Sequence, residues 1–167
     1  QHIELTRRTA RRFNSRYGET FPEPDWLLSQ TPRIMGTDGK TKMSKSLNNE
    51  IGILEAPEVI WEKLRTATTD ENRIRRKDPG NPDICNLYTM HKAFSSADTV
   101  ADVDTQCRDA GIGCIDCKKM LHENIMHELA PIQERATEGE KNPDYVRDVL
   151  KQGAEKCSDL AASVMQD

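Results

Sequence analysis

The sequence of 167 residues has 35% hydrophobic and 31% charged side chains and a net charge of −4, as expected for a soluble chain of one ordinary domain or two small ones. It contains no run of about eighteen apolar residues and no visible signal peptide, which excludes a membrane-spanning helix and gives no sign of secretion. Because the chain begins with Gln1 at a helix-like pattern, we expect it to be a piece of a longer protein.

Helical spacing of apolar residues predicts a first helix over residues 2–17, ended by Gly18. Residues 19–35 contain three prolines and predict a loop with a short extended piece near residues 33–35. A second helix is expected from Pro57 to about Ala67, because proline and an early acidic residue suit a first helical turn.

The charge balance changes sign near the polar segment 68–83. Residues 1–80 hold 15 Lys and Arg against 12 Asp and Glu, net +3, whereas residues 81–167 hold 9 against 16, net −7. We therefore expect two domains, residues 1–70 and residues 71–167.

The second half is predicted to be a helical bundle, so that the fold class is mostly α. Helices are expected over residues 84–95, 100–110 and 114–137, the third with a kink at Pro131, and a last helix follows Asn142-Pro143. The last helix has a continuous apolar stripe that includes Cys157 and predicts a packing face.

The segment GTDGKTKMSKSLNN, Gly36 to Asn49, is called the lysine loop below. Lys42 and Lys45 lie three residues apart on a flexible segment, so both ammonium groups can converge on one polyanion, and nearby serines add hydroxyl donors. Gly36 and Gly39 are expected to let the loop open and close. The alternative is an ordinary solvated charged loop.

Four cysteines form a second pattern, C-x21-C-x6-C-x2-C, made by Cys85, Cys107, Cys114 and Cys117. Without a secretory signal, reduced thiols or metal ligands are expected rather than disulfides. Four thiolates suit Zn²⁺ or a [4Fe–4S] cluster equally by ligand count. The alternative is that these cysteines are small buried hydrophobic residues.

The motif KMSKS, Lys42 to Ser46, is the second signature of class I aminoacyl-tRNA synthetases. The chain resembles the bacterial tryptophanyl-tRNA synthetases over essentially its whole length, and the tyrosyl enzymes fit the flanking blocks less well. The blocks that carry this resemblance are QHIELTRRTARRFNSRYGETF, PRIMGTDGKTKMSKSLNNEI, RIRRKDPGNPDICNLY and CRDAGIGCIDCKKML.

The resemblance implies a C-terminal half: a remnant of the Rossmann-like catalytic domain in residues 1–70 and an α-helical anticodon-binding domain in residues 71–167. The family's HIGH-type signature and its tryptophan-recognising residues lie upstream, so the fragment alone is expected to be inactive. The full-length protein would be a cytoplasmic, homodimeric ligase that activates tryptophan with ATP and Mg²⁺ and transfers it to tRNA(Trp).

The resemblance also assigns roles to residues of the lysine loop. Lys42 and Lys45 would be catalytic and bind the ATP phosphates, Lys45 being the better candidate for transition-state stabilisation. The remaining ATP-site residues would be Ile34, Met43, Ser44 and Ser46. A subset of the family carries an iron–sulfur cluster at four such cysteines, which favours [4Fe–4S] over Zn²⁺.

Contacts to tRNA are expected from two basic groups, Arg73 to Lys77 and the pair Lys118 and Lys119, with solvated surface charge as the alternative. A rival hypothesis for the whole chain is a non-catalytic, metal-bearing helical RNA-binding module. That hypothesis gives no reason for KMSKS to follow PRIMGTDG.

Overall fold

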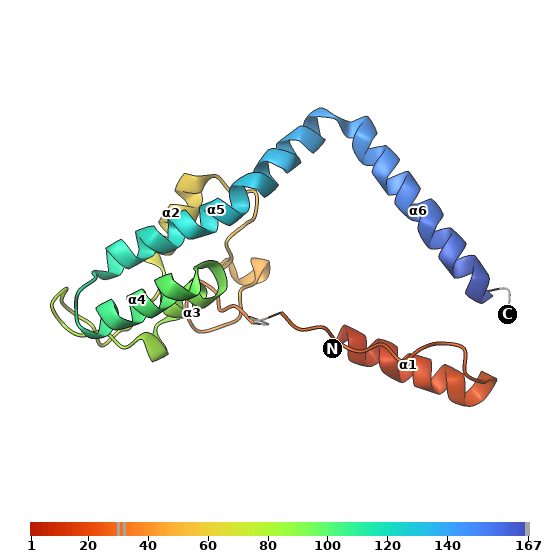
Figure 1. Cartoon of the computed structure of the whole chain (residues 1–167), viewed down its shortest axis with the longest axis horizontal. Coiled ribbons are helices and arrows are strands. Elements are labelled where there is room, and N and C mark those ends of the chain that lie inside the picture. Colours follow the sequence, from red (N-terminus) through yellow and green to blue (C-terminus); the bar gives the residue numbers. More distant parts are fainter. Residues whose placement is uncertain (30, 32, 166–167) are drawn as a thin grey trace. The chain divides into compact units, whose positions relative to one another are not determined.

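The computed structural model describes residues 1–29, 31 and 33–165, and these are mostly helical, as the sequence predicted (Figure 1). The only β-pairing in the described part is an isolated antiparallel bridge between Met35 and Lys42. The elements are α1 (His2–Tyr17), η1 (Lys45–Leu47), α2 (Pro57–Thr66), η2 (Pro82–Ile84), α3 (Asn86–Phe94), α4 (Ala97–Arg108), α5 (Cys114–Lys141) and α6 (Pro143–Met165).

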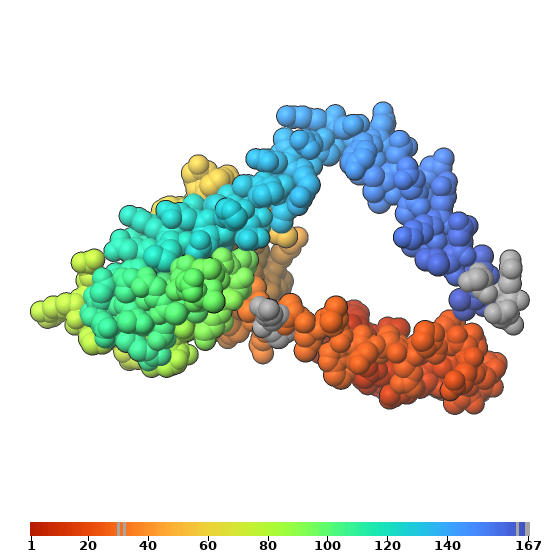
Figure 2. All heavy atoms as spheres, in the orientation of Figure 1, coloured from red at the N-terminus to blue at the C-terminus, as the bar shows by residue number. Residues whose placement is uncertain are grey.

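The chain divides into two compact units, of which the larger comprises residues 30–140 and the other residues 1–29 and 141–167. The larger unit holds the lysine loop and the four cysteines, and Figure 2 shows the atoms of α3 and α4 packed densely against the first part of α5. The predicted domain boundary near residue 70 falls inside this unit and stays a prediction.

The hydrophobic core of the larger unit is formed by α2, α3 and α5. Ile60 and Leu64 of α2 and Leu121 of α5 are fully excluded from solvent. The remaining buried members are Ala67, Leu87, Met90 and Ile125, and Ile34, Met43 and Ile51 pack against the cluster from the lysine loop and its flanks. The loop therefore rests on the core, which fixes its position relative to the helices.

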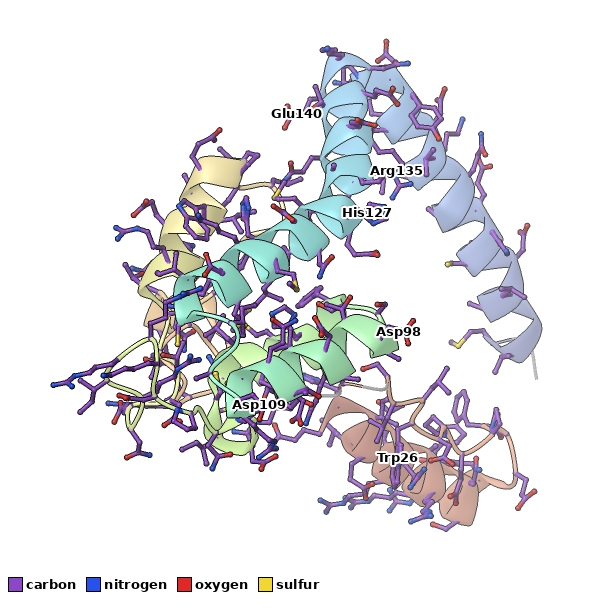
Figure 3. The ribbon with its side chains drawn as sticks, turned by 60° about the vertical axis from the view of Figure 1, so that its left-hand side comes forward. Trp26, Asp98, Asp109, His127, Arg135 and Glu140 are labelled. Carbon is purple, nitrogen blue, oxygen red and sulfur yellow. The ribbon has the colours of Figure 1, made fainter. Side chains whose placement is uncertain are left out.

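Arginines of α1 hold the chain that follows the helix. Arg7 donates to the Asp25 carboxylate at 2.6 Å and to the Pro24 carbonyl at 2.9 Å, and its guanidinium lies over the Trp26 ring. Arg11 pairs with Glu23 at 2.7 Å. Figure 3 shows Trp26 beside α1. These arginines are therefore engaged locally with the segment that follows the helix.

The sequence-based helix boundaries agree with the structure to within a few residues, except that α5 extends to Lys141 instead of ending at Thr137.

The predicted packing face of α6 is not covered within the described residues: Val146, Val149 and Leu150 are exposed, and Cys157 is exposed rather than part of a core. His127, Arg135 and Glu140 likewise lie on the exposed later part of α5 (Figure 3). Among the described helices, none has the length and apolar composition needed to cross a lipid bilayer.

Candidate functional site

The lysine loop is an ordered turn structure rather than an unstructured segment. The Gly36 amide donates to the Thr41 carbonyl at 2.9 Å, and the Met43 amide donates to the Ile34 carbonyl at 3.1 Å. These bonds flank the Met35–Lys42 bridge and place Ile34 directly beside Met43. The structure thus brings the predicted ATP-site residues of the PRIM block and the KMSKS motif together, with KMSKS ending in the single turn η1.

Asn49 is the residue that organises the loop, and sequence reasoning did not single it out. Its side chain is almost fully buried; Nδ2 donates to Asp38 at 3.0 Å and to the Thr41 hydroxyl at 2.9 Å, and Oδ1 accepts from the Ser44 amide at 2.8 Å. A Cβ at Gly36 would lie only 2.1 Å from Asn49 Nδ2. Gly36 is therefore required for close packing in this structure.

Asp38 is the one acidic residue of the loop, and the loop itself uses its carboxylate. Its pKa is lowered to about 2, first by the Lys40 amide and then by hydrogen bonds from Asn49 and Thr41 that outweigh the effect of burial. Asp38 is consequently ionised at neutral pH and satisfied by neutral donors. Hydrogen bonds to the ionised carboxylate close the turn, and the carboxylate forms no ion pair with a lysine of the loop.

The lysine side chains are left available to an external anion. Lys42 and Lys45 are both exposed, and neither makes an ion pair with another residue of the described part. The hydroxyls of Ser44 and Ser46 are 2.9 Å apart and point to the same region of the loop. Two free ammonium groups and two hydroxyls on an ordered backbone form a suitable site for phosphate oxygens.

An open depression of about 890 Å³ lies beside the loop, lined by Met43, Ser44 and Lys45, by segment 50–55 and by Ile132 of α5. Lys63 of α2 fixes that segment by donating to the Glu50 carbonyl at 2.9 Å and to Glu55 at 2.5 Å. From α5, Gln133 donates to two carbonyls of the same segment. One wall of the depression is therefore rigidly supported, and the lysine loop forms the other.

The four cysteines come from three places in the fold of the larger unit. Cys85 precedes α3, Cys107 lies in the last turn of α4, and Cys114 and Cys117 occupy the first turn of α5, where the Cys117 amide donates to the Gly113 carbonyl. All are partly buried free thiols. The pKa of Cys117 is raised to about 12, chiefly by burial and to a smaller extent by the thiols of Cys85, Cys107 and Cys114.

Arg73 lies beside two of these sulfurs. Its Nη1 lies 3.9 Å from both Cys107 Sγ and Cys114 Sγ, and its Nη2 donates to the carbonyls of Arg76 and Ile112. Arg73 Nε is buried without a partner among the described residues. The Arg73 guanidinium is therefore engaged by backbone carbonyls and cysteine sulfurs. This geometry does not match the predicted role of a free tRNA contact.

His91 is a further residue of this region that the sequence did not reveal. It is fully buried, with Nδ1 2.8 Å from the Ser95 hydroxyl and Nε2 3.2 Å from the Cys117 carbonyl. Burial lowers its pKa, so the ring is neutral at pH 7 and donates one bond from Nε2 while Nδ1 accepts the serine proton. His91 thereby fixes the first turn of α5 that carries Cys117.

Within residues 1–29, 31 and 33–165, no three His, Cys, Asp or Glu side chains come together as a group that could hold a single metal ion. A zinc ion bound at about 2.3 Å by thiolates would need sulfurs within about 4 Å of one another. The described part of the chain thus offers no ready-made site for Zn²⁺.

The structure also corrects the expectation for Lys118. This lysine is buried, and its Nζ donates to the carbonyls of Arg65 at 2.8 Å and Ala67 at 2.7 Å. It completes the C-terminal end of α2 and is not accessible to a nucleic acid. Lys119, Arg75, Arg76 and Lys77 are exposed and remain candidates for phosphate contacts.

Comparison with known proteins gives consistent matches. The model of the family described as tRNA synthetases class I (W and Y) matches residues 1–130. Tryptophan–tRNA ligases of Deinococcus radiodurans and Thermotoga maritima are 52% and 43% identical to the chain over 100% and 99% of its length. The chain spans about half the length of these curated relatives, 51% in both cases.

Solved structures agree with this result. Tryptophanyl-tRNA synthetase from Campylobacter jejuni, in complex with ADP and tryptophan, has a TM-score of 0.78 and 26% identity to the chain, with 99% of this chain and 51% of that one covered. The corresponding enzyme from Mycoplasma pneumoniae has a TM-score of 0.75 and 25% identity, over 99% of this chain and 52% of its own.

Proposed function

The chain belongs to the class I tRNA synthetases of the tryptophan and tyrosine group, and on that premise we propose that it is part of a tryptophan–tRNA ligase. Tryptophan is favoured over tyrosine because the matched relatives above are tryptophan–tRNA ligases. The single observation that carries the proposal is the ordered lysine loop, in which Lys42 and Lys45 are exposed and unpaired beside an open depression.

The proposed chemistry is attack of the tryptophan carboxylate on the α-phosphorus of ATP, with pyrophosphate as the leaving group. Negative charge grows on the pyrophosphate in the transition state, so cations aimed at it lower the barrier. Lys42 and Lys45 would bind these phosphates with Mg²⁺, and Lys45, which lines the depression, would contribute most to the transition state. Ser44 and Ser46 would donate to phosphate oxygens, while Ile34 and Met43 would border the nucleotide.

We further propose that the chain is the C-terminal half of this ligase, with residues 1–70 completing the catalytic domain and residues 71–167 binding the anticodon. The KMSKS motif near its start supports this placement, because the upstream HIGH-type signature has no counterpart in the chain. The partner would be tRNA(Trp), contacted by exposed cations such as Arg75 and Lys119. The full-length enzyme would be a cytoplasmic homodimer.

Pyrophosphate exchange tests the proposal. The full-length protein that contains this chain should exchange labelled pyrophosphate into ATP when tryptophan is added and not when tyrosine is added. The 167-residue chain alone should show no exchange, because the proposed tryptophan site lies outside it. Exchange dependent on tyrosine would contradict the substrate, and exchange by the isolated chain would contradict its assignment as an incomplete half.

For the four cysteines we propose a [4Fe–4S] cluster with a structural role, since they are partly buried free thiols of one compact unit and their number suits four thiolate ligands. The Arg73 guanidinium beside Cys107 and Cys114 would offset the negative charge of ligated thiolates. The cluster would stabilise the joint of α3, α4 and α5.

Metal analysis checks this assignment. The chain purified without oxygen is expected to contain about four iron atoms and to show a broad visible absorption that dithionite bleaches. The Cys114→Ala variant should lose iron, whereas Cys157→Ala, which removes an exposed cysteine of the other unit, should keep it. A stoichiometric amount of zinc would contradict the cluster and show that the cysteines bind a zinc ion. Absence of both iron and zinc would show that the cysteines are packing residues.

A further inference from the structure

Two buried polar side chains outside the proposed ATP site hold the base of the lysine loop. Asn86, which is 8% exposed, donates from Nδ2 to the Gly36 carbonyl at 2.8 Å. The same carbonyl accepts the Gly39 amide at 2.9 Å, so Asn86 binds the turn that begins the loop. This bond joins residues 50 positions apart and connects the first residue of α3 with the loop.

The turn also packs tightly on the same surface. Gly39 has φ +65°, and a Cβ there would lie 3.3 Å from Thr68 Cβ and 3.4 Å from Asn86 Cβ. Glycine is favoured at such a position because it adopts positive φ without steric cost and lets the backbone approach closely. Thr68 and Asn86 therefore form a fixed packing surface for the loop.

The environment of Asn86 indicates that its side-chain amide is needed to hold the loop. Its Oδ1 is buried and has no partner among the described residues. A buried oxygen without a hydrogen bond lowers stability, so packing alone would favour an apolar side chain at this position. The donated bond to Gly36 accounts for the presence of an amide there.

Lys118 stabilises the backbone next to Thr68, which is part of this packing surface. Its two bonds to the carbonyls of Arg65 and Ala67 fix the C-terminal end of α2. The next residue, Thr68, donates its amide to the Thr37 carbonyl at 3.0 Å. Lys118 thus secures the backbone that holds the second residue of the loop, just as Asn86 holds the first.

We propose that Asn86 and Lys118 are positioning residues for the lysine loop: they hold its base so that Lys42 and Lys45 meet the ATP phosphates in a defined geometry. Neither residue would touch ATP. The structural part of the proposal concerns this chain alone, and only its catalytic consequence rests on the proposed ligase function. Each residue directly follows a cysteine of the four-cysteine group, Cys85 or Cys117, so the two regions share one scaffold.

Hydrogen exchange of the 167-residue chain tests the structural part independently of activity. Asn86→Ala is expected to speed exchange of amides in residues 36–49 by about tenfold, because one buried bond that anchors the turn is lost. Lys118→Met keeps the side-chain volume but not the donated bonds, and it should speed the same segment. The control Asn124→Ala removes a hydrogen bond to Ser95 without touching the loop, and exchange of residues 36–49 should stay unchanged.

Unchanged exchange of residues 36–49 in folded Asn86→Ala and Lys118→Met chains would overturn the proposal. Acceleration spread evenly over the whole larger unit would overturn it as well, since it would indicate a general loss of stability. In the full-length protein, both variants should lower kcat and raise KM for ATP while leaving KM for tryptophan unchanged. If the loop exchanges faster but wild-type protein shows no tryptophan-dependent activity, the proposed function fails and the positioning role stands.

Discussion

The substitution Lys45→Ala, made in the full-length protein, is expected to slow tryptophanyl-adenylate formation by about 10²- to 10³-fold, the loss typical of removing one donor from developing transition-state charge. Lys45 is exposed, lines the depression beside the loop and makes no ion pair with another described residue. Its truncation therefore removes a charge without breaking a structural contact. The Lys45 carbonyl that accepts the Asn48 amide belongs to the backbone and is kept.

The effect should appear in single-turnover rates of adenylate formation, with little change in the KM for tryptophan. Lys40→Ala is a matched control, because Lys40 is an exposed lysine of the same loop outside the KMSKS motif, and its backbone bond to Asp38 survives the substitution. The control should retain close to wild-type rates. A folded Lys45→Ala enzyme with an unchanged rate would rule out the phosphate role and favour the non-catalytic RNA-binding module.

Local patterns were sufficient to predict the helices from the sequence. Pro57 and Glu58 marked the start of α2, Gly18 the end of α1 and Asn142-Pro143 the start of α6, because each acts through its own backbone conformation or the adjacent helical turn. The KMSKS motif likewise singled out Lys42 and Lys45, which are exposed in the structure, and their role in binding ATP stays a prediction. These features need no knowledge of tertiary contacts.

The residues that hold the site were not predictable in this way. Asn86 contacts Gly36 across 50 positions, and Lys118 contacts Ala67 across 51 positions. No periodicity signals such a pairing, and the charge of Lys118 suggested a surface role that its burial excludes. Gly36 and Gly39, interpreted as hinges from their residue type, are explained by close packing once the neighbouring side chains are known.

The core beneath the loop gives the largest expected effect on stability. Leu121 of α5 is fully buried in the cluster with Ile60 and Leu64 of α2. Replacing it with alanine removes three buried carbon groups and leaves a cavity, which destabilises proteins by about 2–5 kcal/mol. Since single domains are stable by only about 5–15 kcal/mol, this loss is a large share of the total.

Urea unfolding of the Leu121→Ala chain should show this loss as a lower midpoint. Trp61 of α2 makes an edge-on contact with the His122 ring and reports on the larger unit, so its fluorescence is suitable when Trp26 of the other unit is replaced by phenylalanine. Leu150→Ala is the control, because Leu150 is exposed and its truncation should change stability by less than about 0.5 kcal/mol. Ile34 and Met43 pack against the same cluster, so Leu121→Ala should also accelerate hydrogen exchange in the lysine loop. Equal midpoints for the two variants would mean that α5 does not anchor the core on which the loop rests.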